Sequence, residues 1–167
     1  MEEELRFQSK GMGASGYTRE KPTLAKLVTE EAMTSPSLEL QKALYDRLKA
    51  DPVLSAVIGS RVYDTVPEGA EFPYVSFGPF DELSDDAECI TGFEITMQLD
   101  VWSRKPGFPE CRRVGDLVRR AVLGAEIELP DNRLVSISHR QTMTMRDPDG
   151  LTSHGIINFV AFVEQGG

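Results

Sequence analysis

The chain has 167 residues, a length that suits one domain with a hydrophobic core. It carries 18 basic and 27 acidic residues, for a net charge of −9, which argues against a protein that grips nucleic acid through its phosphates. No apolar run approaches the roughly 20 residues that span a bilayer, and the start Met-Glu-Glu-Glu is unlike a basic signal peptide. We therefore expect translation into the cytoplasm. The two cysteines, Cys89 and Cys111, are too few for a disulfide framework, and we expect both to be reduced.

Residues 1–36 are predicted to form an N-terminal arm or extension, either flexible or ordered by a partner. They are polar, and residues 11–16 match the pattern G-x-G-x-x-G. No strand can precede that pattern, so it favours a flexible segment over a nucleotide site. A short helix over residues 23–31 fits the spacing, and Met33 is a candidate alternative start.

Residues 37–165 are predicted to form an α+β domain that opens with two helices. Ser35 and Pro36 provide an N-cap and a first helical residue for a helix that runs to about residue 50. Asp51 and Pro52 repeat this signal for a short second helix, which Gly59 closes.

The domain is organised around a long strand over residues 92–103. Apolar and polar side chains alternate along it, so that one face meets a core and the other meets water. Further strands are predicted at residues 61–66, 72–77, 126–129, 133–145 and 155–164. The proline in 72–77 favours a strand start or an edge, and residues 155–164 are apolar on both faces. An amphipathic helix over residues 108–124 crosses between the strands. This order predicts a mostly antiparallel sheet with helices packed on one face.

Residues with catalytic potential are few. His139 and His154 have no second ligand at metal spacing, and no cofactor motif is present, so no metal, cofactor or catalytic residue is predicted. Cys111 with a histidine could form a nucleophile–base pair in a small cytoplasmic enzyme. However, Cys111 falls on the apolar face of its helix, which favours a structural thiol.

Two sets of charged side chains are candidates for contacts with other molecules. The helix over residues 108–124 places four arginines opposite its apolar face, which fits either solvated surface or a subunit interface: Arg112, Arg113, Arg119 and Arg120. The second set lies in predicted loops and fits either a solvated surface or the lining of a channel: Asp81, Glu82, Asp85, Asp86, Asp147 and Asp149, with Glu88 beside them.

Several short motifs occur in a recognisable order and spacing. They are Leu-Gln-Lys-Ala-Leu-Tyr at 40–45, Gly-Ser-Arg-Val-Tyr-Asp at 59–64, Val-Pro-x-Gly-Ala-x-Phe-Pro-Tyr-Val at 66–75, Leu-Asp-Val-Trp-Ser-Arg at 99–104 and Arg-Asp-Pro-Asp-Gly-Leu-Thr-x-His-Gly at 146–155. Together they resemble the tail terminator, or tail completion, family of long-tailed phages, prophages and gene transfer agents. The resemblance covers about residues 38–163, and the segment before Met33 departs from it.

The resemblance implies a structural protein of the virion tail and neck, present in the host cytoplasm during assembly, with no catalytic residues. Such proteins form a ring, typically a hexamer, that caps the head-proximal end of the tail tube and ends tube polymerisation. The implied partners are further copies of the chain, the major tail tube protein and a head-side connector, while DNA passes through without specific binding and no membrane is involved. A head-side stopper ring is the alternative within the same class.

Overall fold

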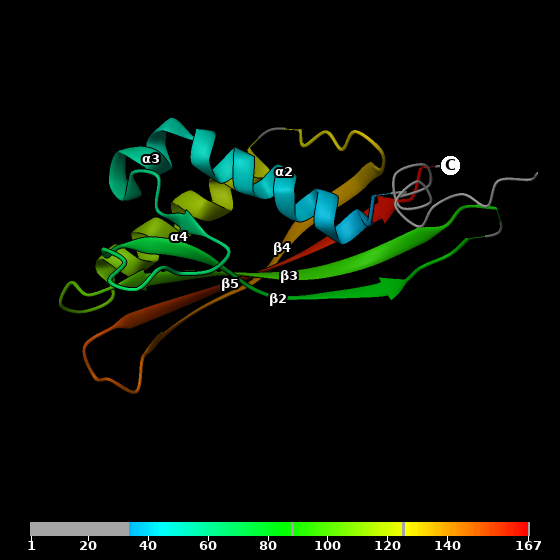
Figure 1. Ribbon diagram of the computed structural model, residues 1–167. Helices are drawn as coiled ribbons and strands as arrows, with labels where there is room; N and C mark the ends of the chain where they lie inside the picture. Colours follow the sequence, from blue (N-terminus) through cyan, green and yellow to red (C-terminus); the bar gives the residue numbers. More distant parts are fainter. Residues whose placement is uncertain (1–33, 88, 125, 167) are drawn as a thin grey trace, which may run out of the picture. The chain divides into compact units, whose positions relative to one another are not determined.

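The computed structural model describes residues 34–87, 89–124 and 126–166. The predicted arm up to residue 33, with its glycine pattern and short helix, lies outside the described residues. Three helices and five strands follow in chain order (Figure 1): α2 (Pro36–Ala50), α3 (Pro52–Ile58), β1 (Val62–Tyr63), β2 (Tyr74–Ser84), β3 (Gly92–Ser103), α4 (Pro109–Leu123), β4 (Arg133–Arg146) and β5 (Ser153–Glu164). The α+β prediction is therefore confirmed. None of the described helices is long and apolar enough to cross a membrane.

The strands form one sheet in the order β1-β2-β3-β5-β4. Only β1 and β2 run parallel, and every other neighbouring pair is antiparallel. β3 lies in the middle, as its alternation predicts, and pairs with β5 over its whole length. Two of the predicted strands differ from the structure: one is shorter than predicted, and the other does not form. β1 has two residues rather than six, and residues 126–129 form no strand, because Ile127 and Leu129 pack against the core without pairing their backbone.

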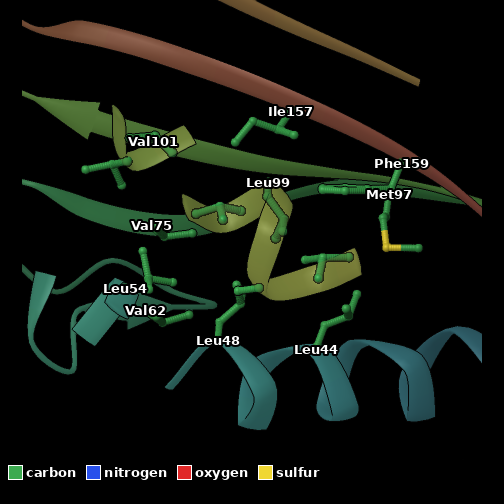
Figure 2. Close-up of a cluster of buried hydrophobic side chains, with 14 of the residues drawn as sticks. Leu44, Leu48, Leu54, Val62, Val75, Met97, Leu99, Val101, Ile157 and Phe159 are labelled. Atoms are coloured by element: carbon green, nitrogen blue, oxygen red, sulfur yellow. The ribbon is translucent and has the colours of Figure 1, made fainter. Parts of the chain in front are cut away.

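The helices cover one face of the sheet, where the core lies (Figure 2). α2 contributes Leu40, Leu44 and Leu48 from positions four residues apart, which is the spacing of one helix face. β3 directs Ile95, Met97, Leu99 and Val101 toward them, and β5 adds Ile157, Phe159, Ala161 and Val163 from the same face. Period-four and period-two patterns thus meet in one apolar layer.

The helix starts differ in how their backbone groups are satisfied. Asp51 caps α3 as predicted, because its carboxylate accepts from the N–H groups of Val53 and Leu54. The Ser35 side chain makes no capping hydrogen bond to α2. Instead, the N–H of Ser37 donates to the carboxylate of Glu82 from β2, at 3.1 Å. A carboxylate at this helix end is also favoured by the helix dipole.

The outer face of the sheet and its edges correct two further predictions. The sequence pattern suggests that both faces of the last strand are covered. Among the described residues only its inner face is covered, and the outer-face side chains of Ile156, Val160 and Phe162 are half-buried. Of the two alternatives for residues 72–77, the strand start is confirmed, because Pro73 directly precedes the first residue of β2. The edge is wrong at Val75, which pairs with β1 on one side and β3 on the other. The described sheet ends at β4 on one side and, on the other, at the two residues of β1 and the part of β2 that extends beyond β1.

Candidate assembly surfaces

The four predicted arginines of α4 divide into two pairs. Arg119 and Arg120 both contact the Asp116 carboxylate of their own helix, each at 2.7 Å. The hydrogen bond from Arg119, supported by Arg120, holds the pKa of Asp116 below its ordinary value. Arg112 and Arg113 are exposed and form no ion pair within the described part of the chain. These two are therefore the arginines of α4 that are freer to meet a carboxylate on another molecule.

Phe108 joins the arginines of α4 to those of β4. The Arg112 guanidinium lies 5.4 Å from the centre of the Phe108 ring, and the Arg146 guanidinium lies 4.9 Å from it. β4 also carries Arg133 and Arg140 and contains no acidic residue. We refer to β4 with its three arginines as the basic edge. The sequence patterns do not reveal that this edge adjoins the arginine face of α4.

The predicted acidic loop is largely a strand. Asp81 and Glu82 lie on β2, which continues to pair with β3 as far as Ser84, so the prediction of a loop there is wrong. In this stretch Ile95 of β3 pairs with Glu82 of β2, and Phe93 pairs with Ser84. Asp85 and Asp86 follow in the turn, while Glu88 lies outside the described residues.

The paired ends of β2 and β3 extend beyond α2 (Figure 1). We refer to residues 80–92 as the acidic hairpin. Some of its carboxylates already have partners, since Glu82 accepts from α2 and Asp86 accepts from the N–H of Gly92 at 3.1 Å. Asp81 is exposed and makes no side-chain hydrogen bond or ion pair to another described residue.

Asp147 and Asp149 lie in the turn between β4 and β5. Asp149 holds this turn by accepting from the N–H groups of Leu151 and Thr152 and from the Thr152 hydroxyl. The hydroxyl hydrogen bond and then the backbone ones hold the pKa of Asp149 below its ordinary value.

This turn lies at the Ser103 end of β3, whereas the acidic hairpin lies at the Gly92 end. Across a 12-residue strand the two ends are roughly 37 Å apart. The six predicted carboxylates therefore form two separate groups, at opposite ends of the sheet.

A polar network on the outer face of the sheet was missed by sequence reasoning. Asp100 is 7% exposed, and its carboxylate contacts Nε2 of His154 at 2.6 Å and accepts from the Gln98 amide at 2.9 Å. The Trp102 ring stacks on His154 with ring centres 3.9 Å apart and donates to Ser76. Alternation along β3 places Asp100 and Trp102 on one face. Only the pairing of β3 with β5 brings His154 to them.

This network does not form a nucleophile–base pair with Cys111. The Cys111 thiol lies in the core on the inner face of the sheet and donates to the backbone oxygen of Val101. Burial raises the pKa of the thiol to about 11, so that it stays neutral at ordinary pH. His139 contacts Thr142 and the Phe159 ring, and the described residues contain no cluster of three metal-binding side chains.

Residues 42–164 match the model of the tail completion protein gp17 family. The chain belongs to this family. The family resemblance predicted from the sequence is therefore confirmed, and with it the prediction of a structural virion tail protein rather than an enzyme. Comparison with curated proteins finds no match.

Two solved structures are similar to this tail completion family member. A chain from the "Virion of native gene transfer agent (GTA) particle" is 32% identical, with a TM-score of 0.70, over 75% of this chain and 94% of that chain. The gp17 protein of bacteriophage SPP1 is 24% identical, with a TM-score of 0.49, over 75% of this chain and 88% of that chain.

Proposed function

We propose that the chain forms a ring, a hexamer, at the head-proximal end of a tail tube. The ring ends polymerisation of the tube protein and joins the tail to a head-side connector. The observation that carries this proposal is the similarity to a chain of a gene transfer agent virion, which extends over 94% of that chain. The match to a tail completion family over residues 42–164 supports the same role.

The charge distribution supports a ring. A closed ring is built from head-to-tail contacts, so each copy needs two different surfaces that complement each other. The basic edge and the arginine face of α4 form a positively charged surface, and the acidic hairpin forms a negatively charged one. The contact between copies then includes Arg112, Arg113, Arg119 and Arg120, with the first two making the larger contribution.

The acidic surfaces also suit the passage of DNA. A net charge of −9 disfavours tight binding of phosphates to the wall of the ring. In this proposal Asp81 and Glu82, which lie on β2, are on the strand edge that meets the next copy. The turn carboxylates at the two ends of the sheet face the lumen or the flanking partners: Asp85 and Asp86 at one end, Asp147 and Asp149 at the other. Because these ends are roughly 37 Å apart, one end would face the tube and the other the connector.

The test is a double reversal of Arg112→Glu and Arg113→Glu, assayed by circular dichroism and by incubation with polymerising tail tubes. Both side chains are exposed, so the variant should fold normally. Like charges brought together at an interface cost several kcal/mol, and a ring repeats that cost at every boundary. We expect folded protein that leaves tubes uncapped and overlong.

The matched control reverses Lys42 and Lys49, which are exposed on α2, to glutamate. This control should cap tubes normally. If the wild-type chain does not limit tube length, the proposed function is wrong. If wild type and both variants cap equally well, the function stands and the α4 arginines are ordinary solvated surface.

A further inference from the structure

Two strand edges of the described sheet, on β2 and β4, carry features that fit each other. We propose that residues 80–84 of β2 in one copy pair with residues 141–146 of β4 in the next copy. The sheet would then continue across each subunit boundary. This inference rests on the proposed ring, and it names the backbone segments that close it.

Both segments are regular strand, and each has one side that pairs with no other described strand. β2 has a register shift between Phe77 and Phe80, and pairs regularly with β3 from Phe80 to Ser84. β4 has two shifts, the second between His139 and Gln141, and pairs regularly with β5 from Gln141 to Arg146. The two regular stretches have five and six residues, the usual length of a strand. Every second N–H and C=O of an edge strand points away from its sheet and needs a partner or water.

The bulges alone would suggest edges built to discourage pairing, since bulges and charges commonly protect edges. The side chains on the regular stretches argue against that reading. Leu83 is 55% exposed on β2, and Met143 and Met145 are 42% and 40% exposed on β4. An edge that avoids partners would carry charges at these positions.

These apolar residues share one face of the sheet. Leu83 is level with Glu94 of β3, on the outer face, and Met143 and Met145 are level with Ile156 and His154 of β5, on the same outer face. If the strands pair, Leu83 of one copy and the two methionines of the next therefore lie on one surface within contact range. Such cross-strand apolar pairs are the unit that stabilises a sheet.

The charges of the two edges are complementary. β4 carries three arginines and no acidic residue, while β2 carries Asp81 and Glu82 and no basic residue. Arg140 and Asp85, which directly follows β2, are both exposed, and neither makes a side-chain hydrogen bond or ion pair elsewhere in the described residues. Arg146 and Arg112, on either side of Phe108, extend the basic surface beside the β4 segment. A second copy of this chain thus fits the β4 edge by both charge and apolar contact.

Strand direction and offset are also suitable. Three antiparallel pairings separate β2 from β4, so the two strands run in opposite directions within one copy. Copies related by rotation about an axis near the strand direction would therefore pair antiparallel. Glu82 is level with Ala161 of β5, while Met143 is level with Ile156, an offset of roughly 17 Å along the strands. Closing a sheet into a ring requires such a stagger.

Hydrogen exchange measured by mass spectrometry tests backbone pairing directly. The full chain would be compared as a monomer and as an assembly on purified tail tubes. We expect amides in residues 80–84 and 141–146 to exchange at least about tenfold more slowly in the assembly. Residues 64–70, in an exposed loop, serve as the internal control and should not change. Protection of only one segment would mean that the tube protein, rather than a second copy, occupies that edge, and would overturn the proposal.

Complementation between variants tests which edges meet. Antiparallel pairing of residues 80–84 with residues 141–146 places Arg140 beside Asp85, just beyond the paired residues. Arg140→Glu and Asp85→Lys should each fold and each assemble at least about tenfold less tightly than wild type. Mixed in equal amounts they should assemble again. Alternating copies place the introduced glutamate beside the introduced lysine at one boundary, and the native Arg140 beside the native Asp85 at the next. Glu68→Lys, an exposed reversal away from both edges, is the control and should neither lose assembly nor rescue Arg140→Glu.

The outcomes separate this inference from the proposed function. If wild-type chains cap tubes as a ring but neither segment is protected, the strand pairing is wrong and the ring stands. If wild-type chains neither form a ring nor bind tubes, both are wrong. Rings in which both edges are protected, with rescue in the mixture, support the pairing of β2 with β4.

Discussion

Glu39 provides a sharp test of how the helices hold the sheet. Glu39 lies on α2 and is 6% exposed, and its carboxylate accepts three hydrogen bonds from the turn that precedes β4. The N–H of Asp131 donates at 2.8 Å, the N–H of Asn132 at 3.0 Å and the Asn132 side-chain amide at 2.7 Å. Because Asn132 lies directly before Arg133, this contact fixes the start of the basic edge against α2.

Replacing Glu39 with alanine removes all three acceptors at once. A hydrogen bond to a charged group contributes roughly 1.5–3 kcal/mol, and a buried donor left without a partner costs about 1–3 kcal/mol. The three bonds share one carboxylate and are not additive. Asp131 is exposed, so water can replace the carboxylate there, whereas Asn132 is 7% exposed. We therefore expect Glu39→Ala to lower the free energy of unfolding by about 2–4 kcal/mol.

Chemical denaturation and thermal melting measure this loss. For a domain of this size about 1 kcal/mol corresponds to roughly 3–5 °C, so the midpoint should fall by about 6–20 °C. Glu39→Gln keeps one oxygen acceptor and should fall between alanine and wild type. Glu68→Ala, at an exposed loop position, should stay within about 0.5 kcal/mol of wild type. A Glu39→Ala protein that is as stable as the Glu68→Ala control would refute the reasoning.

Three further predictions concern buried and charged side chains. A Cβ at Gly155 would lie 2.9 Å from the Cys111 sulfur, so Gly155→Ala should be destabilising. Cys111→Ala alone should lower the free energy of unfolding by on the order of 1 kcal/mol through a small cavity. The variant with both substitutions should lose less stability than the sum of the two single losses, and a loss equal to that sum would contradict this. In native protein at pH 8 a thiol reagent should modify exposed Cys89 and not Cys111, whose pKa is raised by burial to about 11, until denaturant is added. Burial raises the pKa of Glu110, but hydrogen bonds from Lys105 and Ser103 outweigh the effect of burial and hold the pKa below its ordinary 4.5. The stability that Glu110 adds over Glu110→Gln should therefore be present at pH 7 and lost as pH falls below that value; a difference that persists at pH 2 would contradict this assignment.

The sequence by itself determined the elements whose side chains follow one local period. The alternation along residues 92–103 predicts β3 and its buried face, and the same kind of reasoning predicts α2, α3 and α4 with its arginine face. These patterns are readable because the backbone of a helix or strand repeats at 3.6 or 2 residues wherever it occurs. The family could also be recognised, because its motifs keep their order along the chain.

Only the tertiary structure decided which strands are neighbours, because strand order depends on contacts between distant residues. That order places β5 between β3 and β4, so that His154 meets Asp100 and β4 becomes an edge. It also leaves the second half of β2 paired with β3 on one side and with no described strand on the other, so that Asp81 lies on an edge strand rather than in a loop. The local sequence pattern determines which face of each strand is buried. Whether its edges are paired depends on the order of the strands in the sheet.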